Sequence, residues 1–208
     1  GVGCGVRITI GEFNLSQLAS IIGAIENTGL KRFAVCQHID GSDWKAVKEE
    51  RREIIDFLID YAMKNPEMEV VTEQLYDDGV YLLQRVAEHE PELAVEMEKL
   101  LARQGGCPAG DRIVNVDYRG NVHLCPYWQY RTIGNIREQK LSDICFDEEN
   151  EILAMMKDKT QHLKGKCGRC MHKHLCRGCG ARAEEMCGDL FGTDPACYLT
   201  EEEVAAVR

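Results

Sequence analysis

The sequence predicts a mixed α/β fold that begins with a parallel sheet and ends in a metal-binding region. A β-branched run at 6–10, apolar residues at helical spacing over 15–25 and a second apolar run at 31–39 form a strand–helix–strand unit with short connections. Near the other end, six cysteines lie from Cys167 to Cys197 with glycines among them. Such clustering is typical of a metal site, because closely spaced thiolates can bind one soft metal centre.

Composition narrows the class of protein. The chain has 208 residues, enough for one large or two modest domains, and its formal net charge of −10 argues against nucleic acid as the main partner. It contains no run of about 18 apolar residues that would span a membrane. The chain has 11 cysteines, an odd number, and no apolar secretory segment. Both features indicate reduced thiols and a cytoplasmic protein. Because the sequence starts without Met and almost inside a strand, we expect the native chain to extend upstream.

The first two strands and the two helices that follow them are predicted from periodicity. The helix over 15–25 ends at Gly29, and the strand over 31–39 directs Phe33 and Val35 into a core, with Cys36 as a further candidate. Apolar residues from 44 to 62 then predict a long amphipathic helix that stops at Asn65 and Pro66.

A connector and a hairpin come next. Residues 67–104 carry a short strand at 69–72 and helical periodicity at 81–86 and 93–101, without a chemical signal. Gln104-Gly105-Gly106 is a candidate hinge. Strands at 113–116 and 122–124 enclose an Asp117–Gly120 turn, so Cys107 and Cys125 would lie at opposite ends of a short β element. A helix at about 148–157 follows.

The cysteine-rich segment predicts three corners of one site and leaves the fourth open. Cys167, Cys170 and Cys176 have C-x2-C-x5-C spacing, and either Cys179 or Cys197 can complete the set. Iron–sulfur is the preferred interpretation. Structural zinc is the main alternative, since His172 and His174 stand nearby.

This segment is basic, whereas the chain as a whole is acidic. Between Lys159 and Ala183 there are seven Lys and Arg residues and no Asp or Glu. Cations would offset the negative charge of a thiolate-bound cluster and tune its potential. Binding of an acidic substrate and an ordinary solvated basic loop are the alternatives.

Several landmarks then occur in one order. They are Cys107, Gly120, Cys125, Gly134-Asn135-Ile136, Cys167, Cys170, Cys176, Cys179 and Cys197. This order resembles the SPASM/twitch auxiliary-cluster region of radical SAM enzymes over about residues 105–198. Cys179 follows Cys176 after two residues where the commoner pattern has three. That shorter form resembles the tetrapyrrole-modifying branch, which contains the heme-synthase and dioxo-heme enzymes and related maturases.

The resemblance implies a fold and a domain organisation. Residues 1–65 would be the C-terminal portion of a partial (β/α)6 radical SAM barrel, 66–104 a helical connector, and 105–208 an α+β SPASM-type iron–sulfur domain. The barrel's catalytic C-x3-C-x2-C triplet is absent from this sequence, and Cys4 and Cys36 are isolated. By itself the chain would not cleave S-adenosylmethionine, so whether it counts as an enzyme is open.

The resemblance also implies ligands, which are carried over position by position. One [4Fe-4S] cluster would use Cys167, Cys170, Cys176 and Cys197. A second would use Cys107, Cys125 and Cys179, with its fourth iron open or bound by water, Asp111, Asp117 or His123. Cys145 and Cys187 fall outside the pattern and are expected to be small buried hydrophobes, while His172 and His174 are expected to shape the cluster loop. In the barrel part, the residues implied near the S-adenosylmethionine pocket are Arg7, Thr9, Gln37 and His38, although ordinary lumen-facing polar side chains are an equal alternative.

The implied function is oxidoreductase or lyase chemistry on a tetrapyrrole, of the heme-pathway decarboxylation type. In the intact enzyme S-adenosylmethionine would supply a 5′-deoxyadenosyl radical, and ferredoxin or flavodoxin would donate electrons. Substrate propionates would need cations, and the candidates are Lys164, Arg169, Lys173, Arg177 and Arg182. A peptide-modifying SPASM maturase and a non-enzymatic zinc or electron-transfer module are the alternatives.

Overall fold

The protein divides into two compact units. The computed structural model describes residues 3–11, 13–37, 44–73 and 76–205, with the side chains of 37 and 44–47 left out. The first unit comprises Gly1–Leu82 with Ala196–Tyr198, and the second comprises Leu83–Pro195 with Leu199–Arg208. Each unit is described by itself.

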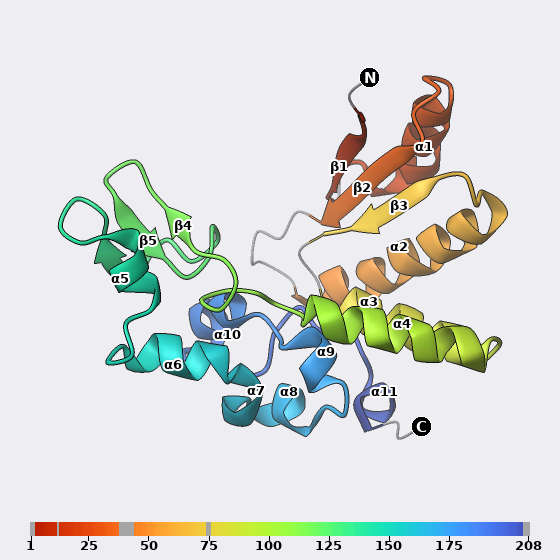
Figure 1. Ribbon diagram of the computed structural model, residues 1–208. Coiled ribbons are helices and arrows are strands. Elements are labelled where there is room, and N and C mark those ends of the chain that lie inside the picture. Colours follow the sequence, from red (N-terminus) through yellow and green to blue (C-terminus); the bar gives the residue numbers. More distant parts are fainter. Residues whose placement is uncertain (1–2, 12, 38–43, 74–75, 206–208) are drawn as a thin grey trace. The chain divides into compact units, whose positions relative to one another are not determined.

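The first unit is built on a parallel three-stranded sheet in the order β1-β2-β3 (Figure 1). Its strands are β1 (Val6–Ile10), β2 (Arg32–Gln37) and β3 (Glu69–Thr72). The crossovers carry the short turn η1 (Leu15–Gln17), α1 (Leu18–Glu26) and α2 (Trp44–Lys64). The predicted strand–helix–strand unit and its parallel pairing are therefore confirmed.

Alternation along the strands explains the core of this unit. Ile8 and Ile10 are buried on β1, and Ile8 lies opposite the fully buried Val35 of β2. Cys36 is also buried, as expected. Leucine and isoleucine at helical spacing supply the apolar faces of the helices. These buried residues are Leu18, Ile22 and Ile25 on α1, and Ile54, Ile55 and Leu58 on α2.

The second unit contains a small antiparallel sheet in the order β4-β5-β6. Its strands are β4 (Asn115–Val116), β5 (Asn121–His123) and β6 (Thr132–Asn135), so the predicted hairpin is present with a shorter first strand than expected. The Asp117 carboxylate accepts the main-chain N–H groups of Arg119 at 2.8 Å and Asn121 at 2.9 Å. Gly120 has φ 87°, which explains the glycine in the turn.

The Gly134-Asn135 pair fixes the third strand. A Cβ at Gly134 would lie 2.8 Å from the side chain of Ile144. The Asn135 amide donates to Asn121 Oδ1 at 3.0 Å and thereby ties β6 to the hairpin. Both residues are thus explained by packing and hydrogen bonding within the sheet.

The second unit also contains a series of helices, most of them short (Figure 1). After α3 (Asp77–Ala87), which crosses from the first unit, they are α4 (Pro91–Gln104), α5 (Leu141–Cys145), α6 (Glu151–Lys157), α7 (Lys159–His162), α8 (Gly165–Arg169), α9 (Lys173–Cys176), α10 (Gly180–Cys187) and α11 (Glu201–Ala205). Among the described helices, none combines the length and the apolar character needed to cross a membrane.

Candidate metal centre

Three of the predicted ligands form a first cysteine group within the second unit: Cys107, Cys125 and Cys179. Cys107 follows α4, Cys125 follows β5, and Cys179 immediately precedes α10. Cys107 acts electrostatically on both of the other thiols. Segments far apart in the sequence therefore bring Cys107 near each of the other two thiols.

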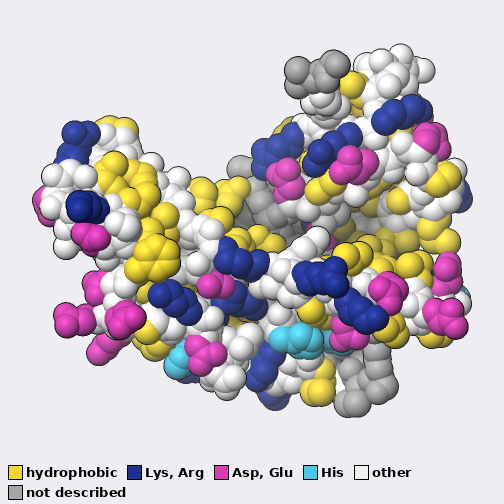
Figure 2. Space-filling model, in the orientation of Figure 1, with side chains coloured by type: hydrophobic (Ala, Val, Ile, Leu, Met, Phe, Trp, Pro, Cys, Tyr) yellow, Lys and Arg dark blue, Asp and Glu magenta, His cyan; other side chains and the backbone are white. Residues whose placement is uncertain are grey.

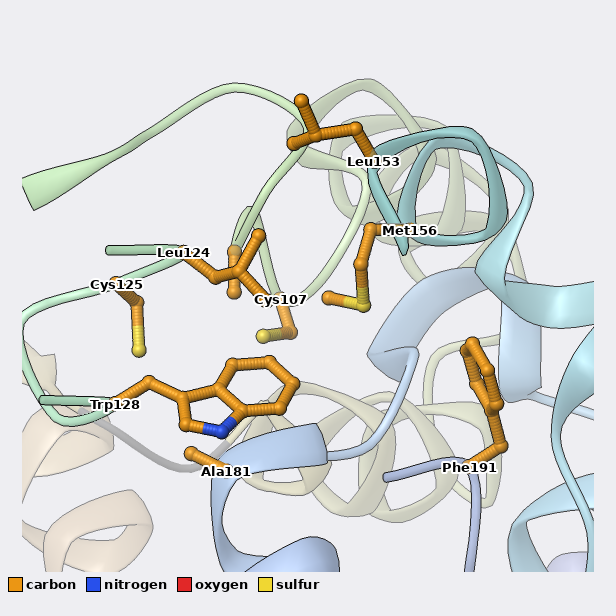
Figure 3. Packing of buried hydrophobic residues seen from close by; sticks show 9 residues of the cluster. Cys107, Leu124, Cys125, Trp128, Leu153, Met156, Ala181 and Phe191 are labelled. Atoms are coloured by element: carbon orange, nitrogen blue, oxygen red, sulfur yellow. The ribbon is translucent and has the colours of Figure 1, made fainter. Parts of the chain in front are cut away.

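An apolar core borders this group. Cys107 and Cys125 belong to the same buried cluster as Leu124, Trp128 and Met156. Figure 3 shows both cysteine side chains extending toward the Trp128 indole. The indole nitrogen donates to Glu184 Oε2 at 2.7 Å, so this wall of the site is fixed in orientation.

Burial makes the free thiolates of this group unfavourable. Desolvation raises the pKa of Cys125 despite opposing main-chain hydrogen bonds from Tyr127 and Trp128, and it raises the pKa of the partly buried Cys179 to about 12 despite the opposing charge of Arg182. A bound metal centre would supply the missing positive charge, since thiols that ligate a metal are deprotonated.

A second cysteine group comprises Cys167, Cys170 and Cys176. Cys167 lies in α8, Cys170 directly follows that helix, and Cys176 is the last residue of α9. Burial raises the pKa of Cys167, with the neighbouring Cys170 adding to the rise, while the Asp194 N–H donates to Cys167 Sγ at 3.3 Å. Main-chain N–H groups directed at sulfur are a familiar feature of iron–sulfur sites.

The two residues between Cys176 and Cys179 have an unusual backbone conformation. Arg177 (φ 65°) and Gly178 (φ 55°) are consecutive left-handed residues. The Arg177 guanidinium donates to Asp111 Oδ2 at 2.6 Å and to the Met156 carbonyl at 2.6 Å. These bonds hold a conformation that is unfavourable for a residue with a side chain, at the point where the chain passes from Cys176 to Cys179.

The two cysteine groups are directly adjacent. The Cys107 N–H donates to the Cys176 carbonyl at 3.0 Å. A Cβ at Gly106 (φ 60°) would overlap that carbonyl, so only glycine permits this approach. Asp194 joins them a second time, because its N–H contacts Cys167 while its carboxylate accepts the Cys179 N–H at 3.0 Å.

Cys197, the remaining predicted ligand, is buried in the Ala196–Tyr198 segment that belongs to the first unit. Tyr198 anchors this segment there, with its hydroxyl donating to Asp78 Oδ1 at 3.0 Å. Asp78 also pairs with the fully buried Arg51. Ligation by Cys197 stays a prediction.

The three candidates for a fourth ligand of the first cysteine group all have other partners. Asp111 pairs with Arg177 at 2.6 Å, and Asp117 caps the hairpin turn. His123 is buried, with Nδ1 2.9 Å from the Arg131 carbonyl and Nε2 3.4 Å from Asp117 Oδ2. Each side chain therefore has a structural role.

The basic segment is engaged internally, which corrects part of the expected propionate cradle. Arg177 is buried against Asp111, and both nitrogens of the Arg182 fork contact Asp194, at 2.9 and 2.6 Å. These two guanidinium groups stabilise the fold, so the expectation that they face a substrate is wrong. Two exposed cations of this segment also have acidic partners. Lys164 pairs with Asp189, and Arg169 pairs with Glu201. Cations and carboxylates are likewise interspersed on the face drawn in Figure 2.

The remaining cysteines and histidines have mixed outcomes. Cys187 is exposed and Cys145 only partly buried, so the expectation of small buried hydrophobes is wrong for Cys187. Its position at the end of α10, next to Gly188, places it in solvent. His172 is buried and its Nε2 lies 3.2 Å from Gln84 Nε2, whereas His174 is exposed.

The predicted pocket residues of the barrel part are only partly described. Arg7 and Thr9 lie on the face of β1 opposite the buried Ile8 and Ile10. Arg7 pairs with Glu73 at 2.6 Å, and Thr9 Oγ1 lies 3.3 Å from Cys36 Sγ. Gln37 ends β2 with its side chain undescribed, and His38 lies outside the described residues.

The donor chemistry of the second unit fits iron–sulfur clusters. Cysteine thiols are the donors in both groups, and main-chain N–H groups reach Cys125 and Cys167. Within the described parts of the chain, no three His, Cys, Asp or Glu side chains close around a single metal ion. Sequence reasoning missed the contribution of Asp194, although this residue stands in an Asp-Pro-x-Cys stretch that could have indicated it. The sequence marks Lys159 only as one of the seven cations of the basic segment.

Comparisons with known proteins agree with this chemistry. Residues 107–171 match the SPASM model, described as an iron–sulfur cluster-binding domain. The chain is 31% identical over 218 residues to Fe-coproporphyrin III synthase of Methanosarcina barkeri, covering 98% of this chain and 55% of that protein. It is 31% identical over 216 residues to pre-heme d1 synthase of Dinoroseobacter shibae, covering 98% and 53%. The chain thus spans about half the length of the curated relatives it matches.

Solved structures show the same fold. The crystal structure of Streptococcus suis SuiB matches with a TM-score of 0.63 at 16% identity, over 94% of this chain and 46% of SuiB. SuiB bound to its precursor peptide SuiA matches with a TM-score of 0.64 at 17% identity, over 96% and 45%. Residues 107–171 therefore match a SPASM iron–sulfur cluster-binding domain, and the chain shares its fold with part of SuiB.

Proposed function

We propose that the chain is the auxiliary-cluster part of a radical SAM enzyme that modifies a tetrapyrrole. The observation that carries the proposal is the pair of adjacent cysteine groups in the second unit, supported by relatives named for heme-related synthesis. The intact enzyme would also bind S-adenosylmethionine, through a catalytic cluster outside this sequence. Residues 1–65, 66–104 and 105–208 would be the barrel part, the connector and the cluster domain.

The proposed ligands follow from the two groups. Cys107, Cys125 and Cys179 would hold one [4Fe-4S] cluster, and Cys167, Cys170 and Cys176 would hold another with Cys197. Bound clusters of this kind supply one-electron transfer. The chain's own residues would exclude water through the apolar wall around Trp128 and donate main-chain N–H groups to sulfur.

Cluster binding is tested by analysis of the chain purified without oxygen. We expect about eight irons and eight acid-labile sulfides per chain, four of each per cluster, and reduced [4Fe-4S] signals in EPR after dithionite. Ser variants separate the groups: Cys125→Ser should remove one cluster and Cys170→Ser the other, while Cys187→Ser, at the exposed thiol, should remove neither. Stoichiometric zinc without sulfide that persists after iron reconstitution would refute the proposal in favour of a structural zinc module.

Substrate class is tested on the intact enzyme. Iron-coproporphyrin III should bind with a saturable change in its Soret absorbance, whereas binding only of a peptide would point to the maturase alternative. Exposed cations are the remaining candidates for propionate binding, namely Lys164 and Arg169, whose side chains are 64% and 63% exposed. The double variant Lys164→Glu, Arg169→Glu should weaken porphyrin binding. Unchanged affinity would remove these two residues from the proposal.

A further inference from the structure

Lys159 is a buried cation that has no acidic partner among the described residues. It begins α7, is 1% exposed, and its Nζ donates to the Gly178 carbonyl at 2.8 Å. Among the residues that the structure describes, no carboxylate forms an ion pair with it. Buried charges in proteins are normally paired or bound to a metal centre, so this ammonium group lacks the anion that its position calls for.

The other cations of the basic segment have partners within the protein. Arg169, Arg177 and Arg182 each pair with a carboxylate, as does Lys164. Lys166 and Lys173 donate to main-chain carbonyls and are only partly buried. Lys159 alone among these seven cations combines nearly complete burial with hydrogen bonding to a neutral carbonyl.

The carbonyl that Lys159 holds lies between the two cysteine groups. A Cβ at Gly178 would be 3.3 Å from Cys167 Sγ, in the second group, and the next residue in the chain is Cys179, in the first. Clusters bound by the two groups would therefore supply the missing anion close to this ammonium group.

We propose that Lys159 is a counter-charge shared by the two cysteine groups, and that it raises the reduction potentials of both clusters together. The inference rests on the proposed function. Reduction adds one electron, taken from an external one-electron donor, and no bond forms or breaks. Because the reduced cluster is more negative, a nearby buried cation stabilises the reduced state more than the oxidised state. Lys159 is thus a positioning residue for charge, without contact to a substrate.

The test is an EPR-monitored redox titration of the reconstituted chain. Lys159→Met removes the charge, Lys159→Arg keeps it, and Lys164→Met removes a cation from the surface of the same segment. We expect Lys159→Met to lower the equilibrium constant for reduction of each cluster at least tenfold, a shift of 59 mV for one electron. Lys159→Arg should restore both potentials, and Lys164→Met should leave both unchanged.

The outcomes are separable. Loaded clusters whose potentials do not move in Lys159→Met, or of which only one moves, would overturn the shared counter-charge. If Lys159→Met fails to load, Lys159→Gln, which can still donate to the Gly178 carbonyl, is titrated in its place. If Lys159→Met and Lys159→Gln both fail to bind clusters while Lys159→Arg binds them normally, the inference is supported. If all three variants fail to bind clusters, the position is purely structural and the inference is overturned. A wild-type chain that takes up no iron and sulfide refutes the proposed function itself.

Discussion

Arg177 is the residue whose removal should destabilise the second unit most clearly. Its guanidinium is buried and donates to Asp111 Oδ2 at 2.6 Å, to the Met156 carbonyl at 2.6 Å and to the Lys157 carbonyl at 3.2 Å. In Arg177→Ala, all three acceptors lose their donor. We therefore expect a lower free energy of unfolding and a loss of the left-handed backbone conformation between Cys176 and Cys179.

The magnitude follows from burial and backbone geometry. Removing one partner of a buried ion pair costs about 3–5 kcal/mol, and the 26% exposure of the Asp111 side chain places this pair near the lower end, since water can reach that carboxylate. Arg177 also has φ 65°, a region that costs about 1–2 kcal/mol for a residue with a Cβ. Arg177→Gly should therefore be more stable than Arg177→Ala by about 1 kcal/mol.

Urea unfolding of the reconstituted chain, followed by circular dichroism, measures these differences. Arg169→Ala is the matched control, because Arg169 pairs with Glu201 but both side chains are well exposed, at 63% and 69%. An exposed pair of this kind contributes at most about 1 kcal/mol. Equal midpoints for Arg177→Ala and Arg169→Ala, or Arg177→Gly less stable than Arg177→Ala, would refute the reasoning.

Three further predictions concern the surroundings of the cysteine groups. Gly106→Ala should cause loss of bound iron, measured by iron analysis, because its Cβ would overlap the Cys176 carbonyl. Trp128→Phe should lower the free energy of unfolding by about 2 kcal/mol in urea titrations, because it removes a hydrogen bond to the charged Glu184. Although burial acts in the opposite direction, hydrogen bonds from Arg131 and Trp128 lower the pKa of Glu184 below its ordinary 4.5. The ionised carboxylate therefore contributes stability that is complete above pH 4.5 and is lost as the pH falls through the lower pKa of the folded state. The difference in thermal midpoint between wild type and Glu184→Gln should be constant at neutral pH and shrink below pH 4.5; a difference that grows on acidification would contradict this.

Local pattern was enough for the secondary structure of the first unit. The β-branched run ending at Ile10 and the alternation around Phe33 predict strands, and β3 has the predicted bounds Glu69–Thr72. The hairpin turn was predictable because Gly120 needs a positive φ. The length of the first hairpin strand was overestimated, since β4 consists of Asn115–Val116 alone.

The sequence could not predict which side chains pair when they lie far apart along the chain. Arg177 finds its carboxylate 66 residues away and Arg182 finds one 12 residues away, so a segment without acidic residues gave no sign that its arginines are paired. Spacing also left open whether Cys179 joins its near neighbours. The left-handed conformation of Arg177, which no residue preference predicts, lies just before Cys179, whose thiol is near Cys107.

The contacts of Asp194 have a consequence for the assembly of the two proposed clusters. Its main-chain N–H touches Cys167 and its carboxylate touches the Cys179 main chain, so ordering one site restrains the backbone of the other. Assembly at the first site thus lowers the conformational entropy that remains to be lost at the second. In a cell short of iron, chains would then be divided between fully loaded and empty forms, and half-loaded forms would be scarce.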